Sequence, residues 1–393
     1  TKVNLIDIPG YFDFAGEQAG PLTICEGAII TVGAVNGLNV GAEKAWAMCD
    51  KTNTARLIVI NQMDRENANF EKAMGTLTEK YGSAVAAIQV PVIEGGKFVG
   101  VASLLDNKAY IGEGKTLKEV DVPASVADEV ESAREALMEA AAGADDELME
   151  KFFEEGELSQ EEMMHGLRKG IADGTVVPVV CCSSVTRVGL TKVLDTIKEI
   201  MPSPAGTVKT GVNPKTGEAV ERICEDDQPF SAQVFKTMAD PFVGKLSLFR
   251  IFSGTLTAQT TLYNVNKDKT EKSSGIYILR GKKQIAKQML HAGDLGALAK
   301  LQFTNTGDTL CDPRKVVSLK QIPYAAPCYS QAIAPKTKGQ EEKVGTGLNR
   351  LNEEDPSFTL VNNAETHQLV LSGAGDQQLD VLVAKLKSRF GVD

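Results

Sequence analysis

Short apolar runs separated by helical stretches dominate the first 200 residues of the chain. The runs are rich in Val and Ile, and they occupy residues 3–6, 28–32, 55–60 and 176–180. Strands that are apolar at nearly every position are typical of a parallel sheet buried on both faces. Crossover helices are expected at residues 42–49 and 69–80. This alternation predicts a doubly wound α/β domain over residues 1–202.

An insert with its own structure separates the last two runs, at about residues 91–175. Gly95-Gly96 lies between β-like runs, which is a hairpin signal. We expect two helices after this hairpin. The first carries apolar residues at helical spacing, namely Val126, Val130, Ala133 and Leu137. Two pairs have the spacing of capping boxes, Ser125 with Asp128 and Ser159 with Glu162.

The second half of the chain changes character after Pro202. The sequence Pro202-Ser203-Pro204 interrupts helix and strand alike, and it predicts a domain boundary. Short β runs with glycine turns follow, at residues 245–255, 261–265, 274–279 and 295–303. They predict a small closed β-barrel over residues 203–322. The order strand, helix, strand, strand, helix then predicts a ferredoxin-like α+β domain over residues 323–393.

The charge of the chain is unevenly distributed. The formal net charge is −10, but residues 119–162 alone carry −14, so the remainder carries +4. The acidity is therefore local and does not exclude a partner that contains RNA. No apolar run reaches the roughly 18 residues of a membrane helix. Seven cysteines without metal-ligand or disulfide spacing indicate a reduced, cytoplasmic protein.

The first candidate site follows the first apolar run, in the sequence Asp7-Ile8-Pro9-Gly10-Tyr11. Asp7 and Gly10 form the DxxG arrangement of GTPases. The carboxylate of Asp7 can hold the water shell of Mg²⁺, and the backbone N–H of Gly10 can approach a γ-phosphate because no Cβ intervenes. The alternative is an ordinary strand-to-loop turn with a solvated Asp.

The second candidate site follows the third run, in the sequence Asn61-Gln62-Met63-Asp64. It matches the guanine-reading NKxD motif except that Gln62 replaces Lys. The carboxylate of Asp64 can accept from the N1–H and N2 amine of guanine, a donor pair that adenine lacks. Asn61 would tether neighbouring loops. The alternative is a strand-to-helix loop with Asn and Asp as turn formers.

Two further segments bear on a nucleotide site. Ser183-Ser184 follows the fourth run, where GTPases place a backbone N–H against guanine O6. Residues 109–116 fit a relaxed phosphate-loop pattern that includes Lys115. A true phosphate loop joins a strand to a helix, whereas the residues that follow Thr116 are β-like. We therefore interpret residues 109–116 as a hairpin in the insert.

Taken together, the chain resembles bacterial elongation factor G, a family of translational GTPases. The segments that carry the resemblance are residues 145–152, 156–159, 238–245, 253–256, 292–297 and 351–356. The resemblance implies a GTPase domain with an insert, a translation-factor β-barrel and a third, ferredoxin-like domain. It also implies GTP or GDP and Mg²⁺ as cofactors, with Asp7 holding Mg²⁺ through water, and a ribosomal partner for a cytoplasmic monomer. No membrane or DNA partner is expected.

Departures from the family pattern shape the expected function. The family has a phosphate loop, GxxxxGK[ST], upstream of DxxG. The resemblance therefore implies that this chain is an internal piece of a longer GTPase, N-terminally truncated and inactive alone. Tyr11 stands where the family has a catalytic His, as in a paralogous branch of the family. We expect GTP hydrolysis coupled to translocation or a related ribosomal step. The alternative is a nucleotide-gated ribosome-binding module with little turnover.

Overall fold

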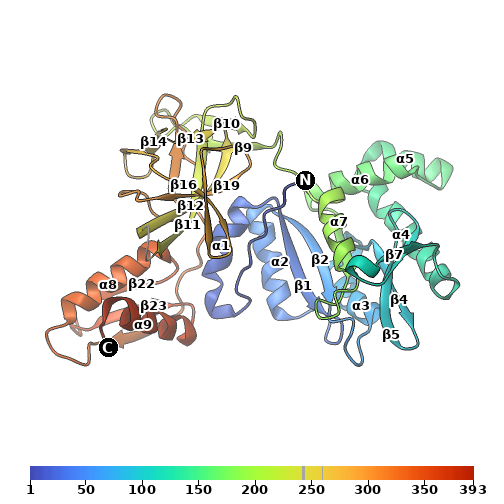
Figure 1. Cartoon of the computed structure of the whole chain (residues 1–393), viewed down its shortest axis with the longest axis horizontal. Coiled ribbons are helices and arrows are strands. Elements are labelled where there is room, and N and C mark those ends of the chain that lie inside the picture. Colours follow the sequence, from blue (N-terminus) through green and yellow to red (C-terminus); the bar gives the residue numbers. More distant parts are fainter. Residues whose placement is uncertain (241–243, 259) are drawn as a thin grey trace. The chain divides into compact units, whose positions relative to one another are not determined.

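The chain divides into two compact units. The computed structural model describes residues 1–240, 244–258 and 260–393. The first unit comprises Thr1 and Cys25–Ser203, and the second comprises Lys2–Ile24 and Pro204–Asp393. Many elements of both units are labelled in Figure 1. Residues 241–243 of the segment 238–245, which contributes to the family resemblance, lie outside the described part of the chain.

The first unit is built on a parallel sheet with the strand order β1-β2-β8-β3. Its strands are β1 (Gly27–Gly33), β2 (Ala55–Asn61), β8 (Val177–Cys181) and β3 (Val85–Ala87). All three of their pairings are parallel. Six of the seven residues of β2 are buried, and so is the whole of β8. The strands predicted at 28–32, 55–60 and 176–180 are confirmed, and β2 and β8 are buried on both faces, whereas Ile29 of the edge strand β1 is 43% exposed.

Helices connect these strands as the sequence predicts. Asn39 caps α2 (Val40–Thr52) by accepting a hydrogen bond from the N–H of Ala42. Asn69 caps α3 (Phe70–Tyr81) by accepting from the N–H of Lys72. In both helices the cap satisfies one of the N–H groups that have no intrahelical partner. α7 (Leu190–Ile200) follows the last strand of the sheet.

The predicted strand at residues 3–6 is wrong. Residues 1–10, all of which are described, adopt no regular secondary structure, and they belong with the second unit from Lys2 onward. Leu5 is 68% exposed, and Lys2 forms an ion pair of 2.5 Å with Asp294. A strand forms only where a neighbouring strand accepts its hydrogen bonds, so the apolar composition of a short run does not suffice.

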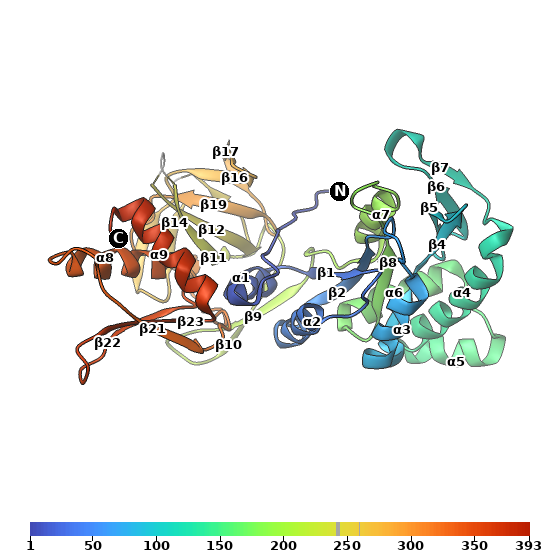
Figure 2. The same cartoon turned by 90° about the horizontal axis from the view of Figure 1, so that it is seen from below.

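The insert combines an antiparallel sheet with helices (Figure 2). The sheet has the strand order β4-β5-β6-β7, formed by β4 (Gln89–Glu94), β5 (Lys97–Ser103), β6 (Lys108–Ile111) and β7 (Lys118–Val120). The hairpin predicted at Gly95-Gly96 is confirmed by the pairing of β4 with β5. The helices that follow are α4 (Ala127–Ala142), α5 (Asp146–Glu155) and α6 (Gln160–Asp173), so the prediction of two helices missed one.

The two predicted capping boxes have opposite outcomes. Ser159 caps α6, and the Glu162 carboxylate accepts a hydrogen bond from the N–H of Ser159, as predicted. At the start of α4 the N-cap is Val126, and no side chain of the described residues caps it, so the box at Ser125 is wrong. A short 3₁₀ turn at Ala124–Val126 precedes α4 and moves its start past Ser125.

The insert and the parallel sheet share one apolar core. Buried residues of the core come from the parallel sheet, from the insert sheet and from α4, α6 and α7, including Val59, Val90, Leu137, Leu167 and Val193. The helices of the insert therefore stabilise the sheet whose ends carry the candidate site.

The second unit contains a β-rich domain and a small α+β domain. The β-rich domain is an antiparallel sheet in the order β15-β14-β20-β11-β12-β19-β16-β17. These strands are β11 (Ser231–Asp240), β12 (Gly244–Ser253), β14 (Thr261–Asn264), β15 (Lys269–Lys272), β16 (Ile276–Arg280), β17 (Lys283–Lys287), β19 (Leu295–Ala299) and β20 (Thr309–Cys311). Shorter pairings join β9 (Val208–Val212) to β10 (Ala219–Ile223) and β13 (Leu256–Thr257) to β18 (Met289–Leu290).

The third domain has the predicted order of elements. It contains β21 (Tyr329–Ile333), α8 (Glu341–Glu354), β22 (Thr359–Asn362), β23 (Leu369–Gly373) and α9 (Asp376–Phe390). Its sheet is antiparallel in the order β21-β23-β22, and Leu348, Phe358 and Leu371 are completely buried in its core. The second unit also holds a 3₁₀ turn, η1 (Phe12–Phe14), and α1 (Gly16–Ile24).

Candidate nucleotide-binding site

The ends of two neighbouring parallel strands bring together the second and third candidate segments. β2 and β8 pair in register, with Ile60 opposite Cys181. The loops that follow them are joined by backbone hydrogen bonds of 3.0 Å from Cys182 N–H to Ile60 O and 3.3 Å from Met63 N–H to Cys182 O. The carboxyl ends of parallel strands are where α/β folds place their ligand sites.

The side chain of Asn61 ties these loops together. Its Oδ1 accepts hydrogen bonds from the backbone N–H of Gln62 (2.7 Å) and of Ser184 (2.9 Å). Its Nδ2 donates to Ser184 Oγ at 3.1 Å. The tethering role expected for Asn61 agrees with these contacts.

Ser183 orients the carboxylate of Asp64. The Ser183 hydroxyl donates to Asp64 Oδ1 at 2.6 Å and accepts from the N–H of Thr186 at 3.0 Å. Ser183 is completely buried, whereas Asp64 is exposed. An ionised carboxylate has about four acceptor positions, so Asp64 keeps capacity for a ligand beside this contact.

The sequence predicted that a backbone N–H of Ser183-Ser184 contacts guanine O6. It did not predict the hydrogen bond from the Ser183 hydroxyl to Asp64. In the structure the N–H of Ser183 donates to Val188 O (3.0 Å), and that of Ser184 donates to Asn61 Oδ1. A contact with guanine O6 would share or displace the second of these bonds. The signal for Ser183 was its place directly after a buried strand, next to the strand that precedes Asp64.

Gln62 adopts the left-handed backbone conformation, with φ of +67°. Residues other than glycine seldom do so, and such conformations persist where surrounding contacts fix them. Here the flanking contacts are Asn61 Oδ1, which accepts the Gln62 N–H, and Met63, which is buried. The side chain of Gln62 is exposed at this turn.

The cysteines behind the site are neutral. Cys182 Sγ lies 3.8 Å from Asn61 Oδ1, and burial raises the pKa of the Cys182 thiol to about 11. Burial also raises the pKa of the neighbouring Cys181 thiol. Because thiolate is the reactive form, neither side chain adds a charge or a nucleophile to the site at neutral pH.

The DxxG residues belong to the second unit. Asp7, Gly10 and Tyr11 are exposed, Tyr11 to 62%, and Tyr11 is the N-cap residue of η1. Within the described residues, a Cβ at Gly10 would meet no atom within 4 Å, and its φ is not left-handed. The fold of the described chain therefore gives no reason of its own for a glycine here.

The described residues fit a Mg²⁺ ion only as the sequence predicts, with the carboxylate of Asp7 holding the ion through water. Among the described residues, no group of three or more His, Cys, Asp or Glu side chains could hold a metal ion. Mg²⁺ usually keeps several waters and takes one or two carboxylates with substrate phosphates. The exposed carboxylate of Asp7 suits that role, which needs no larger cluster.

The segment 109–116 is a hairpin, as expected. β6 pairs with β7 in antiparallel fashion, with Tyr110 opposite Glu119. Gly114–Thr116 forms only a 3₁₀ turn between them, and Lys115 is exposed. No long helix starts here to direct its N–H groups at phosphates.

Comparisons with known proteins cover almost the whole chain. Residues 1–203 match the family described as elongation factor Tu GTP binding domain. Residues 229–313 match elongation factor G domain 2, and residues 324–393 match elongation factor G, domain III. The three matches follow the order of the parallel α/β domain, the β-rich domain and the small α+β domain described above. The chain belongs to the elongation factor G family.

A solved structure supports the same assignment. A crystal structure of a protein from Thermus thermophilus is 28% identical in sequence, with a TM-score of 0.84. The match covers 98% of this chain and 56% of that one, so the chain spans about half the length of this similar protein. Within the described residues, no helix is long and apolar enough to cross a membrane.

Proposed function

We propose that this chain is part of a GTPase that acts on the ribosome in the cytoplasm and couples GTP hydrolysis to translocation or a related step. The observation that carries the proposal is the cluster of Asn61, Asp64 and Ser183 at the ends of β2 and β8. The proposed domains are residues 1–202 with an insert at about 91–175, residues 203–322 and residues 323–393.

Guanine recognition rests on Asp64 in this proposal. Its carboxylate accepts from the N1–H and N2 amine of the base, a paired contact that adenine cannot offer. Ser183 fixes one carboxylate oxygen, and Asn61 holds the loops at a constant separation. Because these contacts exist before a ligand arrives, less side-chain freedom is lost on binding. Gln62 covers one face of the base with a shorter stem than Lys would.

The triphosphate end of the nucleotide involves the residues from Asp7 to Tyr11. When bound, Mg²⁺ would supply positive charge beside the phosphates. Asp7 would orient that ion through water, and the N–H of Gly10 would donate to the γ-phosphate. Tyr11 would hold the attacking water through its hydroxyl, which can donate one hydrogen bond. Ile8 and Pro9 form the loop between Asp7 and Gly10.

Contacts with ribosomal RNA are proposed for the exposed turn between β16 and β17. Arg280, Lys282 and Lys283 lie at this turn, with Gly281 in the left-handed conformation. Positive side chains at a protruding turn suit phosphate contacts. Lys336 also lies at the surface, but it forms an ion pair of 3.1 Å with Asp393, which partly neutralises it.

The test is GTP hydrolysis by the full-length protein that carries this sequence, measured with and without ribosomes. Turnover that rises when ribosomes are added supports the proposal. Tight GTP binding with no turnover in either condition would instead identify a nucleotide-gated ribosome-binding module. Tyr11 in place of His and Gln62 in place of Lys are the features that favour this second candidate.

A further inference from the structure

Asp13 joins the segment after the DxxG loop to the third domain. It lies in η1, two residues after Tyr11, and its Oδ2 accepts a hydrogen bond of 2.8 Å from the N–H of Gln377. Gln377 is in the first turn of α9, and its N–H also lies 2.9 Å from Oδ1 of Asp376. A carboxylate at this position satisfies an N–H without an intrahelical partner and interacts favourably with the helix dipole.

A side chain at the N-cap position of α9 would compete with the Asp13 carboxylate for the same space. Gly375 has a φ of −172°, which is extended backbone that any residue adopts. A Cβ there would nevertheless overlap the Asp13 carboxylate, at 2.7 Å from its Oδ1. Residues that cap helices normally supply their own side-chain oxygen. Here α9 takes its cap from a residue more than 360 positions away in sequence.

A second close approach lies beside the first. A Cβ at Gly16, the first residue of α1, would lie 2.5 Å from Ser357 Oγ. Ser357 Oγ also accepts a hydrogen bond of 2.8 Å from Gln378 Nε2, and Gln378 is only 3% exposed. The segment from Asp13 to Gly16 therefore packs closely against the start of α9 and the loop before β22.

The same segment is fixed to the β-rich domain by α1. Glu17 forms an ion pair with Lys236 of β11, and the buried Arg250 of β12 donates to Ile24 O at 3.1 Å. α1 also packs closely on β11, since a Cβ at Gly20 would lie 2.6 Å from Phe235 O.

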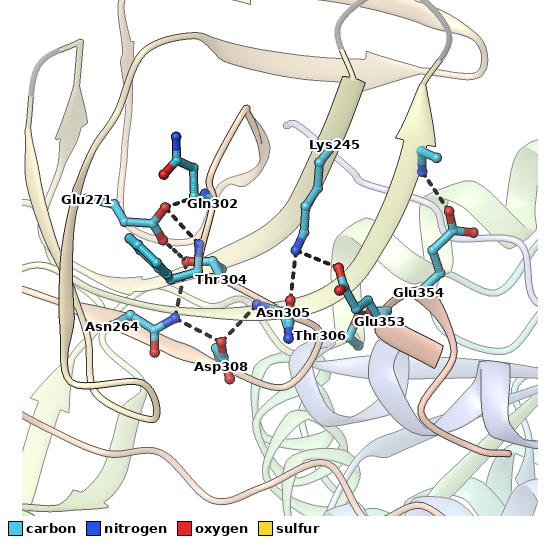
Figure 3. Close-up of polar contacts among 12 residues, drawn as sticks. Lys245, Asn264, Glu271, Gln302, Thr304, Asn305, Thr306, Asp308, Glu353 and Glu354 are labelled. Atoms are coloured by element: carbon cyan, nitrogen blue, oxygen red, sulfur yellow. Dashed lines mark hydrogen bonds and ion pairs between the residues drawn. The ribbon is translucent and has the colours of Figure 1, made fainter. Parts of the chain in front are cut away.

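The far end of α9 is held to the β-rich domain as well. Arg389 donates to both oxygens of Glu354, at 2.8 and 2.9 Å, and Glu354 also accepts from the N–H of Ala239 at 3.0 Å. In Figure 3 the neighbouring Glu353 meets Lys245, which also reaches Asn305. α9 is therefore held at one end by the residues after the DxxG loop and at the other by β11.

Asn305 and Thr306 lie in the loop of the β-rich domain that contacts the third domain. Hydrogen bonds to buried residues of the β-rich domain hold this loop in place. Asn305 donates its backbone N–H to the buried Asp308, which also accepts from Asn264 Nδ2 (Figure 3). Thr306 Oγ1 donates to Glu353 O at 3.1 Å. Because these buried polar groups form hydrogen bonds with one another, the loop that contacts the third domain is rigid.

We propose that Asp13 and Gly375 are positioning residues for GTP hydrolysis. Their contact holds η1 against α9 and thereby sets where the adjacent Gly10-Tyr11 lies. A movement of the third domain would move the DxxG loop, and the reverse. The catalytic consequence rests on the proposed function, whereas the contact itself does not depend on a nucleotide.

Hydrogen exchange on the chain of residues 1–393 without nucleotide tests the contact. The variants are Asp13→Ala, Asp13→Asn and Gly375→Ala. The matched control is Gly345→Ala on α8, where a Cβ meets no described atom within 4 Å. Losing a helix cap is worth about 1 kcal/mol, so the amides of Phe14, Ala15 and Gln377 should exchange roughly fivefold faster in Asp13→Ala and Gly375→Ala. Asp13→Asn keeps an acceptor and should show a smaller change. Gly345→Ala should show none.

The catalytic role is tested in the full-length protein on ribosomes. Asp13→Ala should lower kcat for GTP hydrolysis about fivefold and leave KM nearly unchanged, and Asp13→Asn should recover most of the loss. Unchanged exchange in Asp13→Ala and Gly375→Ala would overturn the contact even if GTP turnover is normal. Faster exchange with an unaltered kcat would overturn the positioning role. If the wild-type protein has no turnover, the proposed function fails, and exchange still decides whether the contact exists.

Discussion

The hydroxyl of Ser183 donates a hydrogen bond of 2.6 Å to Oδ1 of Asp64 and so couples the loops after β8 and β2. The two residues are 119 positions apart in sequence. They meet because β2 and β8 are neighbours in the parallel sheet and end at the same edge. The orientation of the Asp64 carboxylate is therefore set by a buried side chain in the loop that follows a neighbouring strand.

Ser183→Ala should weaken GTP binding by the full-length protein. The variant leaves Asp64 without its donor and the N–H of Thr186 without its acceptor, and a buried hydrogen bond lost in this way costs about 1–3 kcal/mol. The measurement is nucleotide affinity by calorimetry. Ser125→Ala, an exposed serine before α4, is the control and should bind as wild type does. An unchanged affinity in Ser183→Ala would show that Asp64 needs no such support.

Tyr11→His should raise the rate of ribosome-stimulated hydrolysis. An imidazole can become a cation beside the γ-phosphate, whereas the phenol can donate only one uncharged hydrogen bond. Electrostatic stabilisation dominates phosphoryl transfer, so we expect a gain of about tenfold or more. Single-turnover hydrolysis on ribosomes measures it. An equal or lower rate would mean that Tyr11 is fitted to a different mechanism.

The crossing of α4 and α6 should be the most sensitive packing contact of the insert. Gly166 of α6 lies so close to α4 that a Cβ would overlap the carbonyl oxygen of Ala141. Gly166→Ala should destabilise the first unit by about 1–3 kcal/mol, the usual effect of overpacking. Gly75→Ala on the exposed side of α3, where a Cβ meets no described atom within 4 Å, should instead stabilise it by about 0.5–1 kcal/mol. Thermal unfolding distinguishes the two, and equal shifts would contradict the packing.

The start of α6 should depend on pH through Glu162. The Lys151 ammonium, with the hydroxyl and N–H of Ser159, lowers the pKa of the Glu162 carboxyl from 4.5 to about 2. The unfolded chain binds this proton first as the pH falls, so the stabilisation is complete above about pH 4.5 and is lost as the pH approaches 2.

Thermal unfolding between pH 5 and pH 2 tests this prediction. Glu162→Gln should be less stable than wild type at pH 5, and the difference should shrink toward pH 2. The control Glu161→Gln removes a neighbouring charge of the same helix turn without touching the capping box. A difference between wild type and Glu162→Gln that does not vary with pH would rule out the ion pair as its cause.

Local patterns predicted those parts of the fold that depend on local physics. The strands at Ala55–Asn61 and Val177–Cys181 are largely apolar, apart from Arg56 and Asn61, because both faces are covered, and this is visible in the sequence. The capping box at Ser159 needs only residues three positions apart. The run at residues 3–6 is also rich in apolar residues but pairs with no strand of the described residues, and composition cannot report a partner.

Contacts between distant residues could not be predicted in the same way. Asn61 and Asp64 were found because their motif is contiguous. The support from the Ser183 hydroxyl depends on which strands are neighbours. The contact of Asp13 with Gln377 depends on how η1 packs on the third domain, and the only trace of it in the sequence is a glycine at residue 375.

The central claim is that Asp64 selects guanine in a GTPase that the ribosome stimulates. The most direct test is hydrolysis of GTP and of xanthosine triphosphate by the full-length wild-type and Asp64→Asn proteins on ribosomes. The substitution removes a charged acceptor that faces the N1–H and N2 donors, at a cost of about 1.5–3 kcal/mol. We predict that wild type strongly prefers GTP and that Asp64→Asn loses GTP turnover and shifts toward xanthosine triphosphate. The same preference for GTP in both proteins, or no turnover by wild type, would contradict the account.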